Sequence, residues 1–232
     1  KFTIPIVGIT GSVGKTSTKE MISAALETGF RIMKTAGNQN SQIGVPLTLF
    51  RLEKGQELAV VEMGISEFGE MENLVRFAEP DVAVVTNIGE AHIAQFGRKE
   101  NTLKEKLKIA MNFTEKQRVF LNGDDPLLRK AAAELHCPVT LFGTDEGCDY
   151  RAENIWNGDG HVSFTFCAGE LRIPVVLGTM GEHNVRNALV ALGVAHQMGV
   201  DLEAAAEKLR EFHGQRLKFV PCDRCTVIDD TY

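Results

Sequence analysis

The sequence has little of what marks a membrane-spanning, disulfide-stabilised or nucleic-acid-binding protein. No apolar run approaches the roughly 20 residues that a membrane-spanning helix requires. The 232 residues carry a formal net charge of -6, whereas contact with nucleic acid calls for a positively charged surface. The five cysteines are an odd number without the spacing of a disulfide framework. We therefore expect reduced thiols in the cytoplasm, and neither a membrane nor a nucleic-acid partner.

Short, continuous apolar runs alternate with stretches of helical periodicity along most of the chain. The runs at residues 4–9, 58–61, 82–85 and 119–121 are typical of parallel strands that are buried on both faces. Helices are expected at residues 15–26, 70–77, 102–113 and 126–135. This order predicts an α/β fold of the P-loop type, in which helices flank a doubly wound, mostly parallel sheet.

The pattern changes between residues 149 and 178, where apolar and polar residues alternate. Val162, Phe164 and Phe166 are separated by single polar positions, the period of a strand with one exposed face. The segment 157–160 before them (NGDG) has the composition of a hairpin turn. We expect a small antiparallel β extension here, inserted into one domain. The remainder of that domain comprises residues 1–148 and 179–232, with helices at 184–198 and 202–212 and a last strand near 218–228.

A glycine-rich segment, residues 11–16 (GSVGKT), follows the first predicted strand and leads into the first helix. In that context the glycines let backbone N–H groups close around phosphate oxygens, at a helix N-terminus that favours negative charge. Lys15 is expected to reach the β- and γ-phosphates, and the Thr16 hydroxyl to bind Mg²⁺. The usual phosphate loop has a further glycine where this chain has Ile9, so the match is to a shortened variant. The alternative is a glycine-rich turn with an incidental lysine, but the context favours nucleotide binding.

Other polar residues stand where the remaining predicted strands end. Glu62 closes the second strand, where P-loop enzymes carry a carboxylate that binds Mg²⁺; its alternative role is to cap a loop. His92 follows the third strand, as either a ligand or a structural residue. Because the carboxyl ends of parallel strands share one edge of a sheet, these residues should converge there with three polar segments, 10–12, 86–87 and 122–125. The pattern predicts a ligand site at that edge.

One lysine of the predicted helix at residues 102–113 falls among apolar residues. At 100° per residue, Lys106 lies within the stripe formed by Leu103, Leu107, Ala110 and Phe113, whereas Lys104 and Lys108 point away. A buried lysine costs several kcal/mol unless it is neutralised or paired. The alternative is a side chain that extends from the edge of the stripe to water. The sequence leaves both possibilities open.

Taken together, these segments resemble the central ATP-binding domain of the Mur ligase family, over the whole length of the chain. The resemblance rests on residues 9–16 (ITGSVGKT), 37–46 (GNQNSQIGVP), 61–64 (VEMG), 85–92 (VTNIGEAH), 106–109 (KLKI), 181–188 (GEHNVRNA) and 228–232 (IDDTY). The segment around Asn38 and Asn40 and the terminal Asp-Asp-Thr-Tyr favour the member that adds D-Ala-D-Ala to UDP-N-acetylmuramoyl-tripeptide. The other segments are shared across the family.

The resemblance implies a role for each matching residue. The nucleotide would be held by Gly11, Ser12, Val13, Gly14, Lys15, Thr16, Ser17, Asn184, Asn187, Arg216 and Asp230. Thr16 and Glu62 would bind Mg²⁺, and His92 a second metal ion. Lys106 matches a lysine that family members carbamylate with CO₂, which would turn a buried cation into an anion able to support Mg²⁺. Asn40 would lie near the reacting carboxylate, so that Lys15, Asn40, His92 and Lys106 are the expected catalytic residues.

The activity that the resemblance implies is ATP-dependent amide-bond formation in peptidoglycan synthesis, through an acyl phosphate. An N-terminal domain for the UDP-linked substrate and a C-terminal domain are expected outside this chain, so the isolated domain should have little activity. Three alternatives remain: a family member with another amine substrate, such as one that extends folate with glutamate; a P-loop kinase or switch-type NTPase; and a nucleotide sensor without chemistry.

Overall fold

A computed structural model describes residues 4–158, 160–212, 218–222 and 225–229. Its main sheet has nine strands in the order β2-β3-β1-β4-β5-β6-β7-β8-β9. Neighbouring strands are parallel from β2 to β7, and β7, β8 and β9 are antiparallel. The strands are β1 (Ile6–Thr10), β2 (Ile32–Lys34), β3 (Leu58–Glu62), β4 (Val82–Val85), β5 (Arg118–Asn122), β6 (Val139–Gly143), β7 (Tyr150–Gly158), β8 (His161–Ala168) and β9 (Leu171–Leu177). The predicted α/β fold with an antiparallel extension is confirmed.

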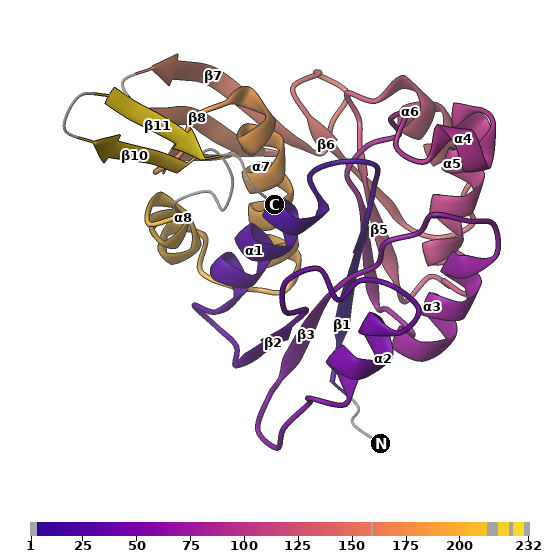
Figure 1. The fold of residues 1–232 in the computed structure, drawn as a ribbon. Helices are drawn as coiled ribbons and strands as arrows, with labels where there is room; N and C mark the ends of the chain where they lie inside the picture. The colour runs from indigo at the N-terminus through magenta and orange to yellow at the C-terminus, as the bar shows by residue number, and fades with distance from the viewer. Residues whose placement is uncertain (1–3, 159, 213–217, 223–224, 230–232) are drawn as a thin grey trace.

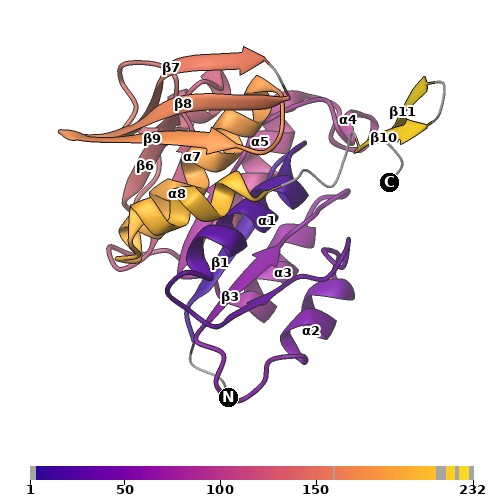
Figure 2. The same ribbon diagram turned by 90° about the vertical axis from the view of Figure 1, so that its left-hand side faces the viewer.

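Helices cover both faces of the parallel part of the sheet (Figures 1 and 2). One face carries α1 (Lys15–Leu26), α7 (Glu182–Gln197) and α8 (Leu202–Arg210). The other carries α2 (Gly44–Leu49), α3 (Glu70–Ala78), α4 (Ile93–Phe96), α5 (Lys99–Leu107), a 3-10 turn (Lys108–Ala110) and α6 (Pro126–Ala132). The chain therefore forms three layers, with the sheet in the middle.

Alternate residues of each buried strand supply the two cores. On β1, Val7 and Ile9 belong to the core beneath α1 and α7. Gly8 faces the opposite layer, where an added Cβ would come within 3.0 Å of the Met63 sulfur and 3.2 Å of Pro80. Contacts this short are tighter than most real Cβ contacts, so a larger residue here would force Met63 and Pro80 to shift.

The antiparallel strands extend the core around α7. Val162, Phe164 and Phe166 are buried in the core shared with α7, as their alternation predicts. β7 ends at Gly158 and β8 begins at His161, which places a hairpin at the predicted turn, although position 159 lies outside the described residues. Helix α7 is consequently packed between α1 and the antiparallel strands.

Several elements differ from the sequence-based predictions. The last strand, expected near 218–228, is a separate antiparallel hairpin of β10 (Lys218–Cys222) and β11 (Cys225–Asp229). The helix expected at 102–113 begins earlier, at Lys99, and tightens into the 3-10 turn after Leu107. Strands β2 and β6 and helices α2 and α4 were not predicted. Each has at most six residues, too few to show a clear period.

Two further observations concern the class of protein. Among the described residues, no helix is long and apolar enough to cross a membrane. Cys137, Cys148 and Cys167 are free thiols.

Candidate functional site

The loop between β1 and α1 has the geometry of an anion-binding turn. Gly14 adopts a left-handed conformation with φ of 81°, which ordinary residues rarely take. Helix α1 then begins at Lys15 with no side-chain cap and no acidic residue in its first turn. A helix N-terminus left open in this way directs backbone N–H groups and positive partial charge at whatever lies before it, which favours an anion.

The segment that follows β4 holds this loop in place. The Val13 N–H donates to Asn87 Oδ1 at 3.0 Å, and the Thr86 hydroxyl donates to the Val13 carbonyl at 2.7 Å. The Gly89 N–H donates to the Ser12 hydroxyl at 2.8 Å. Gly11 packs so closely on Thr86 that an added Cβ would overlap the Thr86 hydroxyl. The loop is thus preorganised by its neighbouring strand before any ligand binds.

Two lysine ammonium groups meet at the base of the loop. Lys15 Nζ donates to the carbonyl oxygens of Gly11 and Ser12 at 3.0 Å and 3.3 Å. Lys106 Nζ donates to the same Gly11 oxygen at 3.1 Å. Burial, together with the charge of Lys15, lowers the pKa of Lys106 to about 7. At neutral pH, a substantial fraction of Lys106 is therefore an uncharged amine.

The alternative of a lysine that reaches water is wrong, because the Lys106 side chain is only 1% exposed. The predicted apolar stripe is shifted, however. Leu103, Leu107 and Phe113 are only partly buried, whereas the innermost positions include Thr102, Glu105 and Lys106. The face of α5 that packs inward is therefore centred on Thr102, Glu105 and Lys106, and the 3-10 turn changes the angular positions only of the stripe residues after Leu107.

Glu62, at the end of β3, lies at the centre of a polar cluster beside the first turn of α1. Its Oε1 accepts hydrogen bonds from Asn40 Nδ2 at 2.7 Å and from the Thr16 hydroxyl at 3.3 Å. Its Oε2 is buried without a hydrogen-bond partner, 3.9 Å from Lys19 Nζ. A buried carboxylate oxygen left without a donor, next to a hydroxyl oxygen, is a ligand set suited to Mg²⁺. Glu62 and Thr16 therefore fit the metal that the sequence implies.

Lys19 belongs to this cluster and was not singled out from the sequence. Its side chain is 0% exposed, and its ammonium contacts Glu20 as well as Glu62. The signal was available: Lys19 shares a helical face with Ile22 and Leu26, at spacings of three and seven, and both are buried. The same argument that drew attention to Lys106 applies to it.

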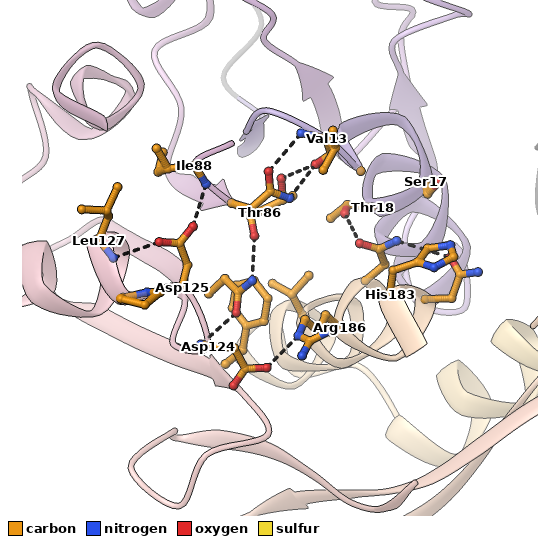
Figure 3. Close-up of a pocket in the computed structure, with 18 of the residues that line it drawn as sticks. Val13, Ser17, Thr18, Thr86, Ile88, Asp124, Asp125, Leu127, His183 and Arg186 are labelled. Atoms are coloured by element: carbon orange, nitrogen blue, oxygen red, sulfur yellow. Dashed lines mark hydrogen bonds and ion pairs between the residues drawn. The ribbon is translucent and has the colours of Figure 1, made fainter. Parts of the chain in front are cut away.

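A cavity of about 820 Å³ opens beside the phosphate loop, between α1, the ends of β4 and β5, and the start of α7 (Figure 3). The predicted residues Val13, Gly14, Ser17, Asn184 and Asn187 all line it.

Two side-chain contacts cross between the walls of this cavity. The Thr18 hydroxyl of α1 donates to Asn187 Oδ1 of α7 at 3.0 Å. Arg186 Nε of α7 contacts Asp124 Oδ2, after β5, at 2.7 Å (Figure 3). Burial alone would raise the pKa of Asp124, but hydrogen bonds from the Thr144 N–H and from Arg186 hold it below its usual value. Asp124 is consequently an anion that fixes Arg186 at the pocket.

Three of the predicted site residues are not found beside the phosphate loop or the cavity in the described part of the chain. His92 is exposed, in a left-handed conformation at the start of α4, and does not line the cavity. Arg216 and Asp230 lie outside the described residues. Within the described ranges, no group of three or more His, Cys, Asp or Glu side chains could hold a metal ion. A metal at Glu62 would accordingly need further oxygen ligands from a bound molecule or water.

The parallel sheet, the glycine-rich turn before α1 and the adjoining cavity define a nucleotide-binding α/β domain of the P-loop type. The protein-family model described as Mur ligase middle domain matches residues 9–195. This chain belongs to the Mur ligase family.

Named relatives resemble the chain over nearly its whole length. It is 38% identical over 232 residues to the UDP-N-acetylmuramoyl-tripeptide--D-alanyl-D-alanine ligase of Bacillus subtilis (strain 168), covering 98% of this chain and 49% of the relative. A crystal structure of MurF from Acinetobacter baumannii matches with a TM-score of 0.91 and 32% identity, covering 99% of this chain and 51% of the other. MurF ligase from Thermotoga maritima, solved in complex with ADP, matches with a TM-score of 0.89 and 31% identity, covering 100% and 54%. The chain thus spans about half the length of these relatives.

Proposed function

We propose that this chain is the ATP-binding domain of an ATP-dependent ligase that adds D-Ala-D-Ala to UDP-N-acetylmuramoyl-tripeptide, in the peptidoglycan synthesis of a bacterial cytoplasm. The observation that carries the proposal is the placement of the Glu62–Asn40–Thr16 cluster directly beside the phosphate loop. A site that only binds a nucleotide needs the loop, whereas transfer of a phosphoryl group also needs a metal-binding carboxylate and a positioned acceptor. The names of the relatives supply the substrates.

In this proposal the triphosphate lies over residues 11–17 and the adenosine occupies the cavity beside α7. The Lys15 ammonium, which donates to the Gly11 carbonyl in this structure, turns instead to the β- and γ-phosphates when nucleotide binds. Asn184 and Asn187 contact the base side of the nucleotide from the first turns of α7, where they line the cavity. Arg216 and Asp230, which lie outside the described residues, keep the nucleotide-binding roles that the family resemblance implies.

Thr16 and Glu62 hold the metal ion, and His92 contributes to a second one. Bound Mg²⁺ supplies positive charge against the phosphate oxygens as negative charge shifts during transfer. Asn40 already orients the Glu62 carboxylate through its 2.7 Å hydrogen bond, and its position next to the phosphate loop suits it to orient the acceptor carboxylate as well. These residues hold the metal ions and orient the reacting groups, while the bonds form and break between the substrates themselves.

The reaction proceeds in two steps. A carboxylate oxygen of the tripeptide attacks the γ-phosphorus of ATP, the bond to the bridging oxygen of ADP breaks, and an acyl phosphate forms. The amine of D-Ala-D-Ala then attacks the acyl carbon, a proton leaves the nitrogen, and inorganic phosphate departs as the amide forms. Since water would hydrolyse the acyl phosphate, the site must exclude water during the reaction.

Lys106 is proposed to carry a carbamate in the working enzyme. Its uncharged amine adds to the carbon of CO₂ and releases one proton, so a buried neutral group becomes a buried anion. The pKa of about 7 supports this, because only the uncharged amine reacts. Incubation with ¹³C-bicarbonate followed by carbon NMR should give one carbamate signal, which the Lys106→Met variant lacks. A spectrum identical in both proteins would refute this part of the proposal.

The intact parent protein provides the test of the function as a whole. ADP release should require both UDP-N-acetylmuramoyl-tripeptide and D-Ala-D-Ala, and Glu62→Ala or Lys106→Ala should reduce it at least a hundredfold. The 232-residue chain alone should release little ADP, because the substrate-binding domains are proposed to lie outside it. Stimulation by another amine, such as glutamate, would reassign the substrate, whereas ADP release without any amine would favour a P-loop kinase or NTPase. A nucleotide sensor would tolerate both substitutions in its biological role.

A further inference from the structure

Lys19 is a fully buried cation that the proposed reaction does not yet use. Its ammonium donates to the carbonyl oxygens of Thr35 at 2.8 Å and Gly37 at 3.3 Å, and it lies 3.0 Å from Glu20 Oε1. Removing an ammonium group from water is costly, and a fold retains one only where its partners compensate. The arrangement of these partners therefore indicates what the lysine does.

Glu20 does not account for the burial of Lys19. The exposed Lys34 already pairs with Glu20, with Nζ 2.7 Å from Glu20 Oε2. Lys19 also contacts the two carbonyls of the segment 35–37, and its ammonium lies 3.9 Å from Glu62 Oε2, which accepts no hydrogen bond. Lys19 thus faces the polar cluster of the site.

The carbonyl partners lie in the segment 35–40, which carries Asn40. This segment is tied to the end of β3, because the Glu62 N–H donates to the Thr35 hydroxyl at 3.0 Å and the Gly64 N–H donates to the Asn40 carbonyl at 2.8 Å. Lys19 itself stands on α1 one turn after Thr16. The Lys19 side chain therefore joins helix α1 to the segment 35–40, in which the Asn40 amide donates to Glu62.

The two oxygens of Glu62 are held from two sides of this junction. Oε1 accepts from Thr16 and from Asn40, while Oε2 faces the Lys19 ammonium. Any shift of α1 that accompanies phosphate binding acts on Thr16 and Lys19 together. The carboxylate and the segment 35–40 would respond to the same movement, because both share Lys19 as a neighbour.

We propose that Lys19 is a positioning residue that couples the phosphate loop to the segment 35–40, so that a bound nucleotide orders Asn40 and Glu62 for the acceptor carboxylate. The inference rests on the proposed function, since it assigns Asn40 to the acceptor side of that same site. A neutral side chain at this position would remove the ammonium that faces Glu62 Oε2 and, with it, this donor to the Thr35 and Gly37 carbonyls. Nucleotide could still bind the phosphate loop, but its binding would no longer order the segment 35–40.

Hydrogen–deuterium exchange in the intact parent protein tests the coupling directly, with Mg²⁺ and a non-hydrolysable ATP analogue as the probe. In the wild-type protein, the analogue should slow exchange in peptides covering both residues 10–18 and residues 35–43. In Lys19→Met, protection of 10–18 should remain while protection of 35–43 falls at least fivefold. The dissociation constant of the analogue should stay within threefold, and kcat should fall at least tenfold.

Lys34→Met is the matched control, because it removes the other cation that contacts Glu20 and should leave both protections and kcat unchanged. If Lys19→Met does not fold, Lys19→Gln, which keeps hydrogen-bond donors but not the charge, is judged by the same measurements. Equal nucleotide-dependent protection of 35–43 in wild-type and variant proteins would overturn the inference, even if the variant were less stable to heat. A wild-type protein that shows the coupling but no ADP release with both substrates would sink the proposed function instead.

Discussion

Lys15 and Lys106 direct their ammonium groups at one acceptor, the carbonyl oxygen of Gly11, at 3.0 Å and 3.1 Å. One carbonyl oxygen cannot compensate for two neighbouring ammonium charges, so the pairing disfavours the charged form of Lys106, while the Lys15 ammonium remains to attract an anion. The same crowding, added to burial, keeps the pKa of Lys106 at about 7. One arrangement therefore attracts phosphate and provides an uncharged amine.

The stability of the fold should depend on pH through Lys106. Its pKa is about 7 in the folded chain and near the ordinary 10.5 when unfolded, so between these values the unfolded chain binds more protons. Stability from this group should rise as pH increases from 7 to 10.5, and its penalty should be fully present below pH 7. In CO₂-depleted buffer, Lys106→Met should flatten this slope in urea denaturation and stabilise the fold at pH 6 by several kcal/mol. The exposed Lys104→Met should retain the wild-type slope; an unaltered slope in Lys106→Met would contradict the assignment.

The close approach of Gly11 to Thr86 should make the phosphate loop intolerant of a methyl group. Gly11→Ala would push the loop away from β4, because the new Cβ overlaps the Thr86 hydroxyl. We expect the dissociation constant of Mg-ATP to rise at least tenfold, about 1.4 kcal/mol, in calorimetric titration. Gly97→Ala provides the comparison, since Gly97 also has a positive φ but nothing lies within 4 Å of its added Cβ. Equal affinities in the two variants would show that the contact does not shape the loop.

The Arg186–Asp124 contact should affect the nucleoside but not the phosphates. Arg186 lines the cavity, and Asp124 fixes it at 2.7 Å. Arg186→Gln should weaken ATP binding about fivefold to tenfold, while the affinity for inorganic tripolyphosphate should stay within twofold. Arg172→Gln, on an exposed arginine of β9, should change neither value. A parallel loss of affinity for both ligands would place Arg186 at the phosphates instead.

Glu62 should decide whether Mg²⁺ strengthens nucleotide binding. Glu62→Gln keeps the shape of the side chain and removes the charge that faces the metal. We expect ATP without Mg²⁺ to bind the variant at least as well as it binds the wild-type protein. Added Mg²⁺ should improve binding of the variant less than twofold, as measured by titration with and without EDTA. Glu57→Gln, just before β3 and exposed, should preserve the full effect of Mg²⁺. A normal Mg²⁺ effect in Glu62→Gln would remove Glu62 from the metal site.

The sequence predicted the parts of the fold and site whose signals are local. The helix after the phosphate loop begins and ends where the sequence indicated, and the buried strands β1, β3, β4 and β5 lie at the predicted apolar runs, within two residues at each end. Strand β6 and helix α2 escaped prediction because each depends on tertiary packing rather than on a repeated pattern. The shape of the site was not predictable for a related reason. Lys19 and Arg186 meet their partners only after distant elements are brought together.

The contact between Thr18 and Asn187 joins residues 169 positions apart in the sequence. Because a ribosome releases the N-terminal part of a chain first, the phosphate loop emerges long before the helix that closes the other wall of the pocket. A ligand stabilises only the states that bind it. A nucleotide can therefore stabilise the complete pocket only once α7 has been synthesised and packed, and until then the nascent parallel sheet depends on its own hydrophobic core.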